Sequence, residues 1–398
     1  MTPPTFRPPV PPAARLDSID LLRGLVMVLM ALDHTRDFFH AGALRGVDPL
    51  DLTQTTPALF LTRWITHYCA PTFILLAGLG AFLSTGRGKS PRDLSWFLLT
   101  RGAWLVVLEW TLVQWAGWNF AFDLHHHNGA VLWAIGWSMI TLAALIHLPV
   151  RIVTAFGLLL IVGHNALDSI RAENLGAWGR LWQILHQGGP VRFGSGHVLY
   201  AAYPLVPWIG VMAAGYGLGA WLQSAPDKRR RRLLTLGAAL TVGFVVLRFS
   251  NLYGNARLWS PQSMPWQTVA AFLDCTKYPP SLCYLLMTLG PALLLLAAWD
   301  AGAPRALRPL LAFGRVPMFF YLLHLPLLHG LAVAAAFAAQ GRADWLYGNG
   351  RSAAPADAGY GLAGVYLAWA VGIAVLYPVC RRFAAYKQGR RAAWLSYF

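Results

Sequence analysis

Residues 18–40 read SIDLLRGLVMVLMALDHTRDFFH, an apolar run from Leu21 to Leu32 with ionisable side chains at both ends. At about 1.5 Å per helical residue, the interval from Asp20 to His34 covers roughly 21 Å, most of the hydrocarbon thickness of a bilayer. The same interval is close to four helical turns, so both side chains lie near one face of the helix. Charged groups within a membrane segment are costly and usually face a bundle interior or a wet cavity. We therefore predict that this helix is functional.

The first end of the helix allows two interpretations. Asp20 and Arg23 can contribute to a site that opens toward the cytosol. Alternatively, Asp20 only interacts favourably with the helix dipole in the first turn, and Arg23 extends its guanidinium to the headgroups.

The far end of the helix carries two pairs at i,i+3 spacing, Asp33 with Arg36 and His34 with Asp37. This spacing brings side chains together on a helix surface, so a carboxylate is expected beside the imidazole. An imidazole oriented by an acid is a general-base arrangement. The alternative is a helix end held by structural ion pairs.

The composition is that of an integral membrane protein. Of 398 residues, 57% are hydrophobic and only 12% charged, whereas soluble domains carry about 25% charged residues. The net charge of +16 would indicate nucleic acid in a soluble chain, but the basic residues collect in short loops between apolar runs, where they set topology. We therefore expect no nucleic-acid partner. The four cysteines are widely spaced, so neither a disulfide framework nor a zinc site is indicated.

Apolar segments of spanning length recur along the chain. The predicted fold class is all-α, a polytopic membrane bundle of about ten transmembrane helices. After the first helix, the segments lie near 59–84, 94–117, 129–148, 150–166, 197–222, 232–250, 279–299, 316–339 and 358–380.

Basic residues alternate between the connections. Arg92, Lys228 and Arg305 lie in the even-numbered connections and Arg381 in the C-terminal tail, which predicts that both termini are cytoplasmic (N-in/C-in). The Pro-rich residues 1–14 are expected to be disordered. Residues 15–398 are expected to form a single membrane domain.

The second and third helices contain further candidate site residues. Arg63 and His67 share a face at i,i+4 spacing near the predicted outer surface and could bind an acceptor beside His34. Alternatively, Arg63 pairs with a headgroup or with Asp51. Arg101 lies near the cytoplasmic end of the third helix, where it could receive an anionic, phosphate-bearing cosubstrate or could extend to the headgroups.

The ninth helix contains two intramembrane histidines, His324 and His329, in the segment RVPMFFYLLHLPLLH. They can belong to a site or only hydrogen-bond neighbouring helices. Lys277 precedes the eighth helix, where it can act at the entrance of a site. The run DLHHHN at residues 123–128 has no familiar ligand spacing and is predicted to be a solvated loop.

Asp20-Leu21-Leu22-Arg23 followed by an apolar run to His34 resembles the first helix of the transmembrane acyltransferase superfamily. The segments LDHTRDFFH, THYCAPTFILLAG and RVPMFFYLLHLPLLH resemble bacterial members of the heparan-alpha-glucosaminide N-acetyltransferase group. This resemblance covers nearly the whole chain.

The resemblance implies transfer of an acyl group, in the first place acetyl, from cytosolic acyl-CoA to a sugar amine or hydroxyl on the outer side. The implied location is the bacterial inner membrane, with membrane lipids and a small-molecule or glycan acceptor as partners and no metal. The oligomeric state is left open, a homodimer being one arrangement. The expected catalytic residues are His34, Asp37 and Asp33; the acceptor-binding residues Arg36, His40, Arg63, His67, Lys277, His324 and His329; and the acyl-CoA-binding residues Asp20, Arg23, Arg101 and Arg315.

One departure from the family pattern leaves the reactive residue open. In the heparan enzyme that this chain resembles, the position of His34 looks to hold Asn, and the reactive His lies further on, in the first outer loop. The nearest counterpart of that His in this chain is His40. A second class of function is a proton-coupled transporter or flippase that uses Asp33, His34, Arg36 and Asp37 as a relay. A third is an assembly protein whose charges only join helices.

Overall fold

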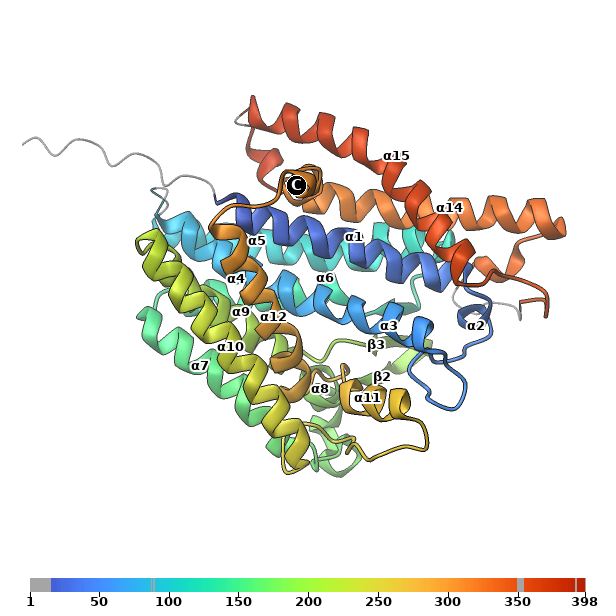
Figure 1. Cartoon of the computed structure of the whole chain (residues 1–398), viewed down its shortest axis with the longest axis horizontal. Coiled ribbons are helices and arrows are strands. Elements are labelled where there is room, and N and C mark those ends of the chain that lie inside the picture. The colour runs from blue at the N-terminus through green and yellow to red at the C-terminus, as the bar shows by residue number, and fades with distance from the viewer. Residues whose placement is uncertain (1–15, 87, 89, 349–353, 391, 398) are drawn as a thin grey trace, which may run out of the picture.

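A computed structural model describes residues 16–86, 88, 90–348, 354–390 and 392–397 (Figure 1). The predicted disorder of residues 1–14 lies outside this range. Helices dominate the described chain: α1 (Asp17–Phe39), α2 (Ala41–Leu44), α3 (Pro57–Ile65), α4 (Cys69–Thr85), α5 (Pro91–Leu108), α6 (Val131–Leu145), α7 (Val150–Gly163), α8 (Gly179–Trp182), α9 (Leu205–Leu222), α10 (Pro226–Ser250), α11 (Pro265–Leu273), α12 (Leu282–Asp300), α13 (Leu310–Gly314), α14 (Pro317–Gln340) and α15 (Leu362–Gln388).

Eight helical segments are long and apolar enough to cross a membrane, which confirms the all-α polytopic class. They are 57–85, 91–119, 150–167, 205–222, 226–250, 282–300, 317–340 and 362–388. Two further predicted spans belong to the same bundle. Helix α1 carries charge at both ends, and α6 is only 15 residues long. The count of ten spans and their direction remain predictions.

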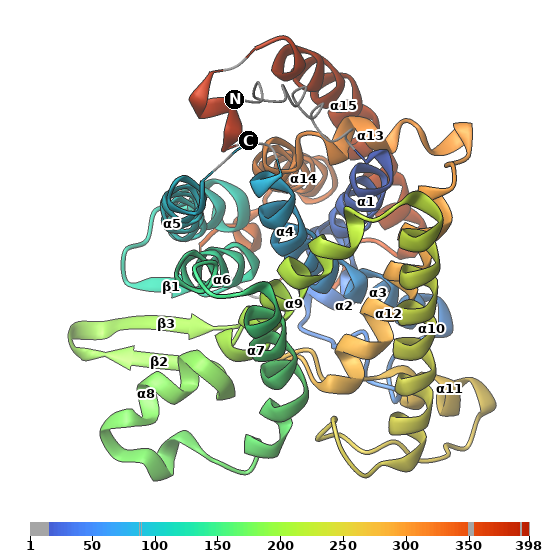
Figure 2. The ribbon, with the colours of Figure 1, turned by 90° about the vertical axis from the view of Figure 1, so that its left-hand side faces the viewer.

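Helix α1 lies at the centre of the bundle, in contact with α4, α12, α13, α14 and α15 (Figures 1 and 2). Two glycines allow α13 to approach its backbone. A Cβ on Gly24 would collide with the carbonyl of Leu310, and a Cβ on Gly314 would collide with the carbonyl of Asp20. This contact brings the residue after α13, Arg315, to the first turn of α1.

The first residues of the predicted span 197–222 form part of a small β-sheet instead of a helix. Strands β2 (Gly189–Phe193) and β3 (His197–Ala201) pair antiparallel, and β3 also pairs parallel with β1 (His126–Asn128) at the edge seen in Figure 2. The left-handed φ of +85° at Gly196 permits the tight reversal between β2 and β3. The prediction was therefore wrong for residues 197–204, because the apolar segment HVLYA is equally compatible with a strand and with a helix. The helix starts at Leu205.

Candidate functional site

Two imidazoles from distant parts of the chain meet at the end of α1. Nδ1 of His34 lies 2.7 Å from Nε2 of His324, which α14 contributes. His324 is fully buried, whereas His34 is only partly so. The edge of the Trp118 ring also packs on His34, with ring centroids 4.9 Å apart. Trp118 belongs to the wide π-helical turn η2 (Glu109–Asn119) that extends α5.

The hydrogen bonds of His324 determine where the protons of this pair lie. Nδ1 of His324 is 2.7 Å from the carbonyl oxygen of Tyr321, which can only accept. A neutral His324 therefore donates from Nδ1 and accepts at Nε2. His34 must then donate from Nδ1, so its Nε2 keeps a free lone pair. This is the form that a general base requires.

Asp33 lies beside this pair and bridges two arginines. Its Oδ2 is 2.5 Å from Nη1 of Arg63, and its Oδ1 is 3.2 Å from Nη2 of Arg36. Asp37 is 2.5 Å from the same Arg36 nitrogen. The predicted pairing of His34 with Asp37 is thus not formed, because Arg36 takes the Asp37 carboxylate and His324 takes the imidazole.

His67 and Lys277 complete this group. Neither ring nitrogen of the buried His67 has a hydrogen-bond partner among the described residues, and the same holds for Nε and Nη1 of Arg36. Lys277 acts electrostatically on Asp33 and lies 5.1 Å from the ring centre of Tyr278. The His34 cluster, as we call this group, consists of Asp33, His34, Arg36, Asp37, Arg63, His67, Lys277 and His324.

Two predicted acceptor residues have other surroundings. His329 faces the carbonyls of Gly117 and Leu346 and stacks between two phenyl rings, so its contacts are those of a packed helix junction. His40 follows α1, and its backbone pairs with Tyr360. Partial burial, together with the charges of Arg36 and Arg45, lowers the pKa of His40 below its usual range. Its ring therefore stays neutral near pH 7.

The predicted acyl-CoA residues form a second group, the Asp20 cluster, at the other end of α1. Asp20 is buried and lies 3.1 Å from Nη1 of Arg23, which also donates to the carbonyl of Gly314. Arg315 approaches the Asp20 carboxylate at 4.0 Å. Arg101 comes from α5 and is close enough for its charge to repel that of Arg23. Two guanidinium groups thus face the buried Asp20 carboxylate, and the third, that of Arg101, lies near Arg23.

Sequence reasoning missed the direct contact between His34 and His324. Both had been named, but in different roles. The available signal was that two intramembrane histidines from different helices require polar partners within the bundle. Trp118 carried no signal among 18 tryptophans.

Comparison with known families identifies a match over the first part of the chain. A family model described as heparan-alpha-glucosaminide N-acetyltransferase, catalytic, matches residues 15–249, more than half of the chain. Among curated proteins, no sequence matches. The matched range includes α1, Arg63, His67 and Arg101, whereas Lys277, Arg315 and His324 lie beyond it.

Proposed function

Because the chain belongs to the heparan-alpha-glucosaminide N-acetyltransferase catalytic family, and is thus a multi-pass membrane acetyltransferase, we propose that it moves acetyl groups across the membrane. The donor is cytosolic acetyl-CoA, and the acceptor is a sugar amine or hydroxyl on the outer side. The location we propose is the bacterial inner membrane.

The observation that carries this proposal is the pairing of His34 with His324. The carbonyl of Tyr321 orients His324, and His324 in turn orients His34 with a free lone pair on Nε2. A positioned general base typically contributes about 10² to 10⁴-fold to a rate. His34 is accordingly the proposed catalytic residue and His324 its positioning residue.

The proposed reaction proceeds by nucleophilic attack on the thioester. The acceptor nitrogen bonds to the acetyl carbonyl carbon while Nε2 of His34 removes a proton from that nitrogen. The carbon–sulfur bond then breaks, and the proton passes to the departing thiolate of coenzyme A. The products are the acetylated acceptor and the free thiol of coenzyme A, and His34 returns to its neutral form.

The acceptor side of the proposal rests on unpaired buried polar atoms. Arg36 and His67 together present four ring or guanidinium nitrogens without a described hydrogen-bond partner. Such buried groups cost free energy unless a ligand or water satisfies them. Sugar hydroxyls can both donate and accept, so they suit these nitrogens.

The donor side rests on the Asp20 cluster. Arg23, Arg101 and Arg315 converge there from three parts of the chain. Guanidinium groups bind phosphates through paired, charge-assisted hydrogen bonds. The phosphates of coenzyme A would bind here, and the thioester arm would reach along α1 to His34.

The test is acetyl transfer by the purified protein, measured as consumption of radiolabelled acetyl-CoA in the presence of glucosamine-terminated oligosaccharides. We expect His34→Ala to retain no more than about one hundredth of the wild-type turnover, the lower bound for loss of a general base. The matched control is His147→Ala, which replaces an exposed histidine far along the chain. A folded His34→Ala variant with normal turnover would remove His34 from the reaction. Acceptor flux without thioester consumption would instead favour transport.

A further inference from the structure

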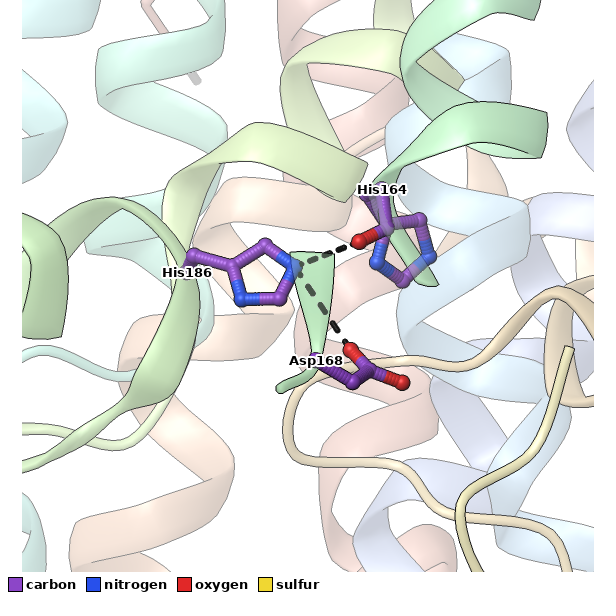
Figure 3. Close-up of side chains that lie close together, drawn as sticks. All are labelled: His164, Asp168 and His186. Carbon is purple, nitrogen blue, oxygen red and sulfur yellow. Dashed lines mark hydrogen bonds and ion pairs between the residues drawn. The ribbon is translucent and has the colours of Figure 1, made fainter. Parts of the chain in front are cut away.

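A second group of ionisable side chains lies outside the His34 cluster. His164 begins the short turn η3 (His164–Leu167) at the end of α7, Asp168 follows that turn, and His186 lies in the turn η5 (Gln183–Gln187) after α8. Figure 3 shows their side chains converging. One ligand atom from each residue lies within 4.8 Å of the others.

His164 has no ordinary hydrogen bonding to explain its position. The residue is only 2% exposed, yet neither ring nitrogen has a hydrogen-bond partner among the described residues. The carbonyl of Pro280 is close enough to interact electrostatically with the His164 ring, but the two groups do not have the geometry of a hydrogen bond. A buried imidazole of this kind loses its hydrogen bonds with water and gains only the weak interaction with Pro280 in return.

The neighbouring residues hold the other two side chains in place. Asn165 donates from Nδ2 to Oδ2 of Asp168 at 2.9 Å, which leaves Oδ1 of the carboxylate directed toward His186. The oxygen of the same Asn165 side chain accepts from the backbone of Leu282 at the start of α12. Trp182 stacks on the His186 ring with centroids 4.8 Å apart. The hydrogen bond from Asn165 to the Asp168 carboxylate is of the kind that typically orients a metal-ligating carboxylate.

We propose that His164, Asp168 and His186 bind one divalent transition-metal ion, zinc according to their ligand types. Two imidazoles and one carboxylate, with water or a carbonyl in the fourth position, form a common zinc ligand set. Tetrahedral bonds of about 2.0 Å separate ligand atoms by roughly 3.3 Å. Nε2 of His186 lies 3.6 Å from Oδ1 of Asp168 and 2.8 Å from the carbonyl oxygen of His164. The three ligand atoms lie within 4.8 Å of one another, so side-chain adjustment would bring them to this separation.

Binding also balances protons and charge. Nε2 of His186 must carry a proton to bond to the His164 carbonyl. Metal binding at Nε2 would shift that proton to Nδ1 of the same neutral ring, with no net release of a proton. The carboxylate supplies one negative charge against the two positive charges of the ion. A cavity of about 230 Å³ that Asp168 and His186 line gives the ion access. The sequence predicted no metal, and positions 164, 168 and 186 were not among its candidate ligands.

The ion would connect the end of α7, the turn η5 and, through Asn165, the start of α12. The same cavity is lined by Tyr278, which adjoins Lys277 of the His34 cluster. The metal would thus fix one wall beside the acceptor region. This inference is independent of acetyl transfer.

The test is zinc content and zinc affinity of the full chain in detergent. Protein stripped with a chelator is titrated with Zn²⁺ by calorimetry, and bound zinc is measured by mass spectrometry after dialysis. We expect one zinc per wild-type chain and a thermal midpoint that rises with Zn²⁺. His164→Ala and His186→Ala should lose the bound zinc and the rise. Asn165→Ala, which keeps all three ligands, should weaken binding by about 10 to 100-fold.

The matched control is His126→Ala in the exposed DLHHHN run, which should bind zinc as the wild type does. Cobalt provides a second measurement, since a tetrahedral site gives intense visible absorption. A wild-type chain that takes up no stoichiometric zinc would overturn the proposal. Undiminished zinc in all three of the His164, His186 and Asn165 variants would also overturn it. Should the histidine variants fail to fold, wild-type stoichiometry and Asn165→Ala decide the question.

Discussion

Nδ1 of His34 and Nε2 of His324 are 2.7 Å apart although 290 positions separate the two residues in sequence. Their rings are nearly parallel, with an interplanar angle of 23°. Since the Tyr321 carbonyl accepts from His324, the two hydrogen bonds run in one direction through both imidazoles. This relay fixes the tautomer of the residue that we propose as the base.

We predict that His324→Ala lowers kcat about tenfold, because a lost hydrogen bond of roughly 1.4 kcal/mol corresponds to that factor. The KM for acetyl-CoA should not change, since the Asp20 cluster lies at the other end of α1. Steady-state kinetics with purified protein measures both values.

Restoring an acceptor distinguishes positioning from packing. His324→Gln keeps an oxygen that can accept from His34 Nδ1 and should recover part of the lost kcat. His329→Ala removes another buried histidine of α14 and should affect stability more than turnover. Equal loss of kcat in the Ala and Gln variants of His324 would contradict the positioning role.

We predict that His40→Ala retains more than half of the wild-type turnover, because its backbone rather than its ring makes the contact with Tyr360. The assay is the same acetyl transfer, with His147→Ala beside it. If His40→Ala abolishes turnover while His34→Ala does not, the reactive imidazole belongs to the loop after α1.

We predict that Asp33→Ala destabilises the fold more than any exposed carboxylate does. The Asp33 side chain is 13% exposed and is the common partner of Arg36 and Arg63. Removing one partner of a buried ion pair typically costs about 3–5 kcal/mol. Thermal unfolding in detergent measures the change, with the exposed Asp357→Ala as control. A midpoint equal to that of the control would mean that the ion pairs of Asp33 with the two arginines do not stabilise the fold.

We predict that Arg101→Ala weakens acetyl-CoA binding at least tenfold, since hydrogen bonds to charged groups contribute about 1.5–3 kcal/mol. Calorimetry with coenzyme A gives the affinity without turnover. Arg151→Ala removes an exposed arginine at the start of α7 and should bind normally. Identical affinities for both variants would mean that Arg101 does not bind the donor and only helps to set the membrane topology.

We predict that a cysteine at Arg230 reacts with an impermeant thiol reagent only from the cytosol and that one at Leu258 reacts from outside. Both positions are exposed, and all four native cysteines are buried, so background labelling should be low. The reverse pattern would invert the predicted direction of every span.

The sequence by itself determined the helical class and the place of α1. Apolar runs of spanning length need no tertiary information, because every backbone polar group in a lipid environment must be satisfied within the segment. The charges that bracket Leu21 to Leu32 likewise identified both ends of α1. Where that logic failed, at HVLYA, pairing with β2 and β1 decided the structure, since a strand takes its hydrogen bonds from distant residues.

Only the tertiary structure decided which side chains meet. The i,i+3 spacing placed Asp37 near His34, but Arg36 forms the ion pair with Asp37, and α14 supplies the actual partner of the imidazole. The convergence of His164, Asp168 and His186 was equally hidden. Local spacing fixes neighbours along one helix, whereas contacts between helices depend on packing such as the close approach at Gly24 and Gly314, which no local pattern encodes.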